Sequence, residues 1–193
     1  MKPLLWIGAP IVAVAILRPW TVRPIERSRP AVFDAATFAS SAWPRLVREA
    51  TQTATDVPEI TAGSSTPARF VKGTGVVAAI DRRSRVGVMQ VRLTGSGQTT
   101  VAIQIGPVIR GTALRDAASF IRFSDFTNQS DYAAAASALN DYALRTVIEP
   151  AQIDGLQGRT VAFSGAVARS AAREDGAIEV VPLHLEVLGA GLK

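Results

Sequence analysis

The segment Phe70–Ile80, with the sequence FVKGTGVVAAI, decides the fold of this chain. It is rich in β-branched residues, and Gly73 and Gly75 are two positions apart, which places both on one face of a β-strand. Glycine in a strand interior often marks a tight bend of the kind found at the corners of a small barrel. We therefore predict that this segment is a strongly coiled strand of a β-barrel.

Two more strand-like segments come next in the chain. Asp81–Arg85 is predicted to be a turn, and Val86–Leu93 alternates apolar and polar residues. Thr94–Gly97 is predicted to be a hairpin loop because it is rich in glycine and hydroxyl residues, and Thr99–Ile105 alternates again. The three strands together predict an antiparallel meander.

A helix is predicted over residues 129–148, with Thr127 or Asn128 as its cap and Pro150 after its end. Apolar residues recur along it at helical spacing. They are Tyr132, Ala135, Ala136, Leu139, Ala143 and Val147.

Two final strands are predicted at Thr160–Val167 and Ala177–Leu188, because both segments alternate. Three strands, one helix and two strands (β-β-β-α-β-β) is the chain order of the OB-fold, a small five-stranded Greek-key barrel. We therefore expect an α+β protein with an OB-like five-stranded β-barrel over residues 68–193.

A small helical subdomain is predicted before the barrel, over residues 30–67. Asp34 can cap the free N–H groups of a first helical turn, and Phe33 can pack on Phe38. Pro44 is expected to kink or restart this helix. The stretch Thr51–Pro67 is predicted to be a loop because it is polar and contains glycine and proline.

Residues 1–29 are predicted to be a signal anchor with a juxtamembrane linker. Leu4–Leu17 is apolar, and extending it through Val22 gives about the 20 residues that a bilayer requires, although this includes Arg18. The alternative is a buried helix of the domain, which Pro10 disfavours. Basic residues are more frequent after the apolar run than before it, and this bias favours a cytoplasmic location for the domain.

Charge and composition exclude several classes of function. The net charge is +5, but residues 1–29 contain five basic residues and one acidic residue, so only +1 remains for the rest. A nearly neutral domain lacks the broad basic surface of a nucleic-acid-binding protein. Without cysteine, the chain contains no disulfide, cysteine nucleophile or lipid-attachment cysteine.

The sequence also contains few candidate catalytic residues. His184 is the only histidine, in a predicted strand, where a surface or satisfied core histidine is expected. Glu174 and Asp175 are adjacent carboxylates in a predicted loop. We predict a non-enzymatic protein with no cofactor and no metal site.

Residues 105–132 form a polar stretch between the third strand and the long helix. Its arginines could bind a carboxylate, phosphate or sugar hydroxyl, with neighbouring polar residues assisting. The alternative is structural: Asp116 would pair with Arg110 or Arg115, and the amides would satisfy strand ends and helix termini. We favour the structural alternative because ion-pair networks imitate sites. The candidate binding residues are Arg110, Gly111, Thr112, Arg115, Asp116, Asn128 and Gln129.

The same stretch contains three phenylalanines, Phe120, Phe123 and Phe126, spaced three residues apart. They could contact a partner, but aromatic residues in such a position more often cover a core.

The chain also resembles a bacterial family of unknown function, the predicted periplasmic lipoproteins, over about residues 30–190. The residues that carry the resemblance are Phe33-Asp34-Ala35 with Trp43-Pro44, Lys72-Gly73-Thr74-Gly75, residues 106–116 (GPVIRGTALRD), Phe126 with Asn128-Gln129, Ala138-Leu139-Asn140 and Val181-Pro182.

The resemblance implies a helical subdomain with an OB-like barrel, an envelope location, and genes that often lie beside those of sugar ABC importers. It implies no catalytic or binding residues. We therefore expect a protein anchored in the inner membrane with its domain in the periplasm, despite the charge bias. Its expected role is that of an accessory or binding protein, with components of a sugar ABC transporter or a small sugar or anion as partner. The alternative is a structural or assembly protein of the envelope without a ligand.

Overall fold

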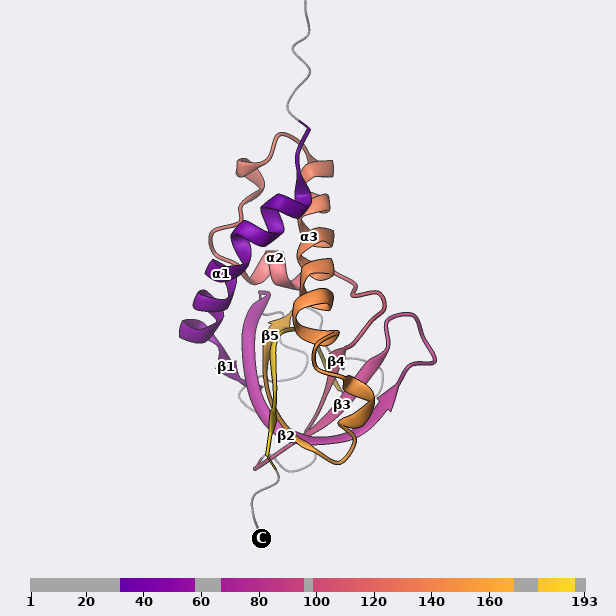
Figure 1. The fold of residues 1–193 in the computed structure, drawn as a ribbon. Helices are drawn as coiled ribbons and strands as arrows, with labels where there is room; N and C mark the ends of the chain where they lie inside the picture. The colour runs from indigo at the N-terminus through magenta and orange to yellow at the C-terminus, as the bar shows by residue number, and fades with distance from the viewer. Residues whose placement is uncertain (1–31, 58–66, 96–98, 169–176, 190–193) are drawn as a thin grey trace, which may run out of the picture. The chain divides into compact units, whose positions relative to one another are not determined.

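The computed structural model describes residues 32–57, 67–95, 99–168 and 177–189, and those from Phe33 onward belong to one compact unit of mixed α and β structure (Figure 1). The predicted α+β class is confirmed. The helical elements are α1 (Ala35–Thr53), α2 (Ala113–Ala117), the 3-10 turn η2 (Phe123–Asp125), α3 (Gln129–Ala143), the π-helical turn η3 (Leu144–Ile148) and the 3-10 turn η4 (Ile153–Gly155). The strands are β1 (Thr55–Asp56), β2 (Arg69–Asp81), β3 (Val88–Leu93), β4 (Thr100–Gln104), β5 (Thr160–Val167) and β6 (Ile178–Leu188).

Five of the strands pair in a closed circuit. Strands β2, β3 and β4 form the predicted antiparallel meander. Strand β4 pairs with β6 in parallel, β6 pairs with β5, and β5 pairs with β2, so that every strand of the circuit has two neighbours. The short strand β1 adds to β2 in parallel. The circuit encloses one apolar core, which includes Val71, Met89, Val91, Ile103 and Val161.

Strand β2 pairs with both β3 and β5, and its glycines allow this. Gly75 is aligned with Leu93 on β3 and with Val161 on β5. A Cβ atom on Gly75 would lie 2.3 Å from the carbonyl oxygen of Arg92, and one on Gly73 would lie 2.9 Å from the Phe163 ring. Both positions therefore require glycine for the close approach of their neighbours.

The helices cover one end of the sheet, where α1 packs against α3 (Figure 1). A second core lies there, and it joins Leu46 of α1, Leu114 of α2 and Leu139 of α3 to Ala166 and Val181 of the sheet. Because helices and strands share this core, the segments predicted as residues 30–67 and 68–193 pack as one body over their described parts.

The start of α1 agrees with the prediction from sequence. Asp34 accepts hydrogen bonds from the backbone N–H groups of Ala36 and Thr37, each at 3.1 Å. A hydrogen bond from the Thr37 hydroxyl, with those N–H groups, holds the pKa of Asp34 below its ordinary value. The rings of Phe33 and Phe38 are 5.6 Å apart, as expected for a staple across the first turn.

Several predicted boundaries were wrong. Thr51–Thr53 belong to α1, and the predicted loop that begins there contains β1, whose two residues are too few for a periodic signal. Pro44 lies inside α1, and the helix continues through it without a restart. The helix predicted over 129–148 is α-helical only to Ala143 and then becomes the π-helical turn η3.

The predicted anchor, residues 1–29, lies outside the described residues, as do Glu174 and Asp175. Within the part of the chain that the structure describes, no helix combines the length and the apolar character that a membrane span requires.

Candidate functional site

Four of the predicted binding residues bind each other or cap the start of a helix. Arg115 is buried and pairs with Asp116, with 2.7 Å between Nη2 and Oδ1, and its Nη1 donates to the backbone carbonyl of Tyr132 at 3.1 Å. Its guanidinium carbon lies 3.7 Å from the centre of the Tyr132 ring. Thr112 donates to Asp116 at 2.6 Å. Asn128 caps α3, because its Oδ1 accepts from the Asp131 N–H at 2.9 Å. These contacts are of the kind expected from the structural alternative, in which the polar residues bind one another and cap helices.

Gln129 is the first residue of α3, and its side chain is exposed. It takes no part in the hydrogen bonds and ion pairs that Arg110 and Arg115 form with other described residues. The structure therefore does not bring the seven predicted residues together around one centre.

Arg110 differs from Arg115, because its backbone is fixed and its side chain is exposed. The N–H of Arg110 donates to Oε1 of Gln104 at 2.7 Å, and its carbonyl accepts from Nε2 of the same side chain at 3.2 Å. Beside it, Asn140 donates to the carbonyl of Gly111 at 2.8 Å. Gly111 has a φ of 89°, a conformation that favours glycine.

Arg110 and Gly111 line a cavity of about 260 Å³. Glu179 of β6 also lines it, and its Oε1 accepts from Gln104 at 2.7 Å. Sequence reasoning missed Gln104, Asn140 and Glu179. The available signal was weak: Gln104 and Asn140 are amides at otherwise apolar positions of a strand and a helix, and each is only 4% exposed.

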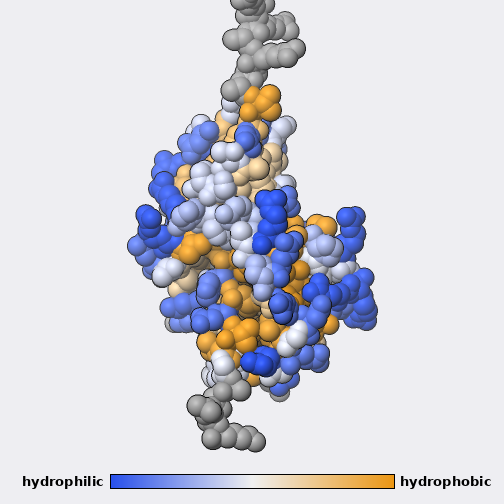
Figure 2. Space-filling view, in the orientation of Figure 1, coloured by the Kyte–Doolittle hydropathy of each residue, from blue (hydrophilic) through white to orange (hydrophobic). Residues whose placement is uncertain are grey.

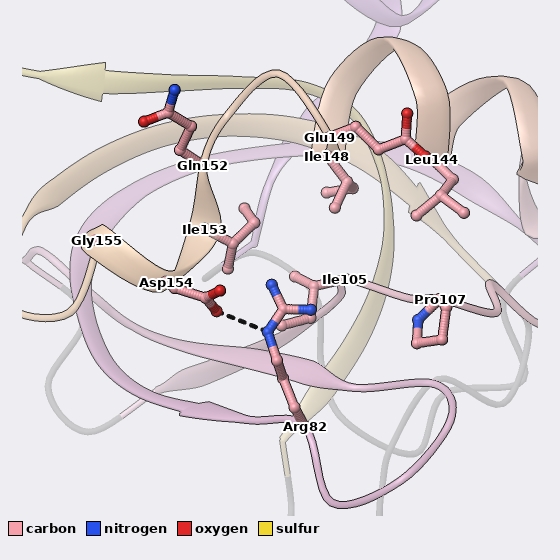
Figure 3. A pocket seen from close by; sticks show the side chains of 10 residues that line it. All are labelled: Arg82, Ile105, Pro107, Leu144, Ile148, Glu149, Gln152, Ile153, Asp154 and Gly155. Carbon is pink, nitrogen blue, oxygen red and sulfur yellow. Dashed lines mark hydrogen bonds and ion pairs between the residues drawn. The ribbon is translucent and has the colours of Figure 1, made fainter.

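A larger cavity of about 570 Å³ is lined in part by Ile105 and Pro107, which belong to the same polar stretch (Figure 3). Apolar side chains from three parts of the chain line it, namely Ile105, Pro107, Leu144, Ile148 and Ile153. Figure 3 shows Arg82 extended toward Asp154, with 2.7 Å between Nε and Oδ1. The ion pair is exposed, since the two side chains keep 45% and 79% of their surface.

The chain around this larger cavity has two irregular backbone features. Leu144 and Ile148 belong to the π-helical turn η3, and π-helical turns occur frequently at functional sites. Gln152 has a φ of 47°, which only a few per cent of residues other than glycine adopt. Conformations of this kind cost about 1–3 kcal/mol each and cluster at ligand-binding sites. Sequence reasoning missed this cavity entirely, because its residues look like the end of a helix and a loop.

The histidine and the phenylalanines singled out from the sequence lie outside both cavities. His184 is exposed on β6 and lines a separate groove of about 370 Å³ with Trp43. Phe126 packs against Phe38, with ring centres 5.4 Å apart, and therefore covers the helical core. Phe123 is 55% exposed. In the orientation of Figure 2, hydrophobic surface gathers over the sheet, with hydrophilic side chains along its margins.

Residues 59–186 match the family described as predicted periplasmic lipoprotein (DUF2291), so the chain belongs to this family. No curated protein matches it. An OB-fold protein of Thermotoga maritima has a similar structure, with a TM-score of 0.62 and 18% identity over 81% of this chain and 99% of that one. An OBody bound to hen egg-white lysozyme matches with a TM-score of 0.35 and 14% identity over 68% of this chain and 93% of that one.

Proposed function

We propose that this member of the predicted periplasmic lipoprotein family is a non-enzymatic binding protein that takes a small sugar or anion in the cavity beside Arg82. The observation that carries the proposal is the composition of this cavity. Isoleucine side chains form its floor, and the Arg82–Asp154 ion pair lies at its mouth. Ligand sites are mostly apolar concavities with a few placed polar groups that fix orientation.

The ion pair gives the cavity its chemical preference. A guanidinium presents planar, paired donors that match a carboxylate or two neighbouring hydroxyl groups. Asp154 accepts hydrogen bonds from hydroxyl groups, and the isoleucines cover the apolar face of a ring or short chain. Because an exposed ion pair contributes only about 0–1 kcal/mol to stability, a ligand can replace it at little cost.

The chemistry of the chain supports a binding role without catalysis. It contains no cysteine, and its single histidine, His184, lines a different groove. Arg82 and Asp154 form an ion pair with each other.

The architecture and location belong to the same proposal. We infer that the closed circuit of β2, β3, β4, β6 and β5 is an OB-like barrel, supported by the similarity to the Thermotoga maritima OB-fold protein. We also propose that residues 1–29 anchor the protein in the inner membrane and that the domain lies in the periplasm, as the family description suggests. Association with a sugar ABC importer rests on the family resemblance alone. The second candidate is an envelope assembly protein without a ligand.

Ligand binding is tested by thermal unfolding of the full-length protein with monosaccharides, sugar acids and simple anions. A ligand at 100 times its Kd stabilises the folded state by about 2.7 kcal/mol. At about 2–4 °C per kcal/mol, we expect the Tm to rise by about 5–10 °C. The substitution Arg82→Ala should remove the shift. Arg83→Ala is the matched control, because Arg83 pairs with Asp81 and does not line the cavity.

Two outcomes would contradict the binding role. A broad panel without any shift would favour the assembly protein, and a shift that survives Arg82→Ala would place the ligand elsewhere. Location is tested separately by adding protease to spheroplasts, where a periplasmic domain is digested and a cytoplasmic one is protected. Crosslinking in membranes, followed by identification of the partner, tests the link to a transporter.

A further inference from the structure

We propose that the cavity beside Arg110 and Glu179 is a second binding site, which takes a small zwitterion of the α-amino acid class. Arg110 would bind the carboxylate, and Glu179 would bind the ammonium group. This site is separate from the cavity beside Arg82, because the two share no lining residue. Four observations carry the inference.

The first observation is the immobile backbone of Arg110. The buried amide of Gln104 contacts both its N–H and its carbonyl, and the buried amide of Asn140 contacts the carbonyls of Gly111, at 2.8 Å, and Ile109, at 3.4 Å. Two buried amides from β4 and α3 thus fix three consecutive residues. Binding groups held in place before the ligand arrives lose less entropy when it binds.

The second observation is the cost of this arrangement. Oδ1 of Asn140 is buried and has no hydrogen-bond partner in the described part of the chain. A buried acceptor without a hydrogen-bond partner destabilises the folded state, because it has lost its water and gained nothing in return. Selection for stability alone would not keep an unsatisfied acceptor at this position, and departures of this kind are expected at functional sites.

The third observation is that the fold uses Arg115 and leaves Arg110 free. Arg110 belongs to none of the ion pairs formed among the described residues. Arg115 bonds to Asp116 and lies over Tyr132, whereas Arg110 lines the 260 Å³ cavity. A guanidinium on a fixed backbone is suited to bind a carboxylate through two parallel hydrogen bonds.

The fourth observation is the orientation of Glu179 in the same cavity. Gln104 donates to Oε1 of Glu179 at 2.7 Å, and Oε2 takes part in no hydrogen bond or ion pair with the described side chains. The same Gln104 side chain therefore positions both charged residues. The remaining lining side chains are small and apolar, namely Ala113, Ala168 and Val181. A guanidinium and a carboxylate around a small apolar wall match the charges of an amino acid with a short side chain.

The test is isothermal titration calorimetry of the full-length protein with glycine, L-alanine and L-serine. Acetate and methylammonium, which carry one charge each, separate the two halves of the site. We expect at least one amino acid to bind and each single-charge probe to bind about tenfold or more weakly, since each probe lacks the hydrogen bonds that one of the two charged groups would make. The salt dependence of Kd should be small, because the ligand is neutral overall.

Three variants locate the binding. Arg110→Ala and Glu179→Gln should each weaken it about tenfold or more, and neither should unfold the protein. Arg110 is exposed, and a glutamine at position 179 still accepts from Gln104. Arg82→Ala should leave amino acid binding unchanged, which also separates this site from the proposed sugar or anion site.

Absence of binding by all three amino acids at millimolar concentration would overturn the proposal. Equal binding of acetate and L-alanine would also overturn it, because Glu179 would then contribute nothing. Amino acid binding that is lost in Arg82→Ala and kept in Arg110→Ala would place the ligand in the larger cavity instead.

Discussion

Replacing Arg115 by alanine should destabilise the domain, whereas replacing Arg110 by alanine should not. The two arginines lie five positions apart in the same polar stretch, and sequence alone treats them alike. In the structure, the side chain of Arg115 is 11% exposed. It pairs with Asp116 of α2 and donates to the carbonyl of Tyr132 in α3, so it joins the two helices. The Arg110 side chain is exposed and belongs to no ion pair among the described residues.

The size of the effect can be worked out from the contacts of Arg115. Hydrogen bonds to a charged group contribute about 1.5–3 kcal/mol, and a largely buried cation over an aromatic ring adds about 1–2 kcal/mol. Asp116 keeps 37% of its surface, so water screens part of the ion pair and the lower part of these ranges applies. We expect Arg115→Ala to lower the free energy of unfolding by about 3 kcal/mol. For Arg110→Ala we expect a change within about 0.5 kcal/mol.

The assay is urea unfolding of the full-length protein, monitored by circular dichroism. At about 2–4 °C per kcal/mol, Arg115→Ala should also lower the Tm by about 6–12 °C. Arg115→Lys is a useful intermediate, because it keeps the charge and loses the planar fork. Equal stability of Arg115→Ala and the wild type would refute the structural role of this residue. A comparable loss in Arg110→Ala would refute the distinction on which the second site depends.

Two further predictions concern the fold. Gly75→Ala should destabilise the protein by about 1–3 kcal/mol in the same urea assay, because its Cβ would lie 2.3 Å from a backbone oxygen. Gly155→Ala is the control and should be nearly neutral, because a Cβ at that position would have no atom within 4 Å. A neutral Gly75→Ala would contradict the close approach of β2 and β3. The lowered pKa of Asp34 means that its ionised carboxylate stabilises the folded state above the ordinary value of 3.8, and this stabilisation is lost as the pH falls through the lowered pKa. The stability advantage of the wild type over Asp34→Asn should therefore shrink below pH 3.8. An advantage that does not depend on pH would contradict this cause.

The sequence predicted the strands well because their signals are local. Alternation of apolar and polar residues places β3 and β5, and two glycines mark where the neighbours of β2 approach it closely. It could not predict which strands pair across the circuit. The parallel pairing of β4 with β6 joins Val101 to Ile178, and no local pattern encodes a contact between residues so far apart.

The site was harder to predict than the fold for a related reason. The sequence offered seven candidate binding residues between Arg110 and Gln129 but favoured a structural role for the stretch, and Arg115, Asp116 and Asn128 do complete local structure. The residues that position Arg110 come from elsewhere in the chain, Gln104 from β4 and Asn140 from α3.

A polar residue in an apolar strand or helix has to find a partner when it is buried, and in this fold the partner is a backbone segment near Arg110. Buried amides such as Gln104 and Asn140 are therefore better pointers to a site than the exposed charges around them. Exposed charges are common on every surface, whereas a buried amide is kept only where the structure satisfies most of its hydrogen bonds. The larger cavity lies beside two further costs of this kind, the left-handed Gln152 and the π-helical turn after α3, and Ile148 and Ile153 from these segments also pack in the core that the strands enclose.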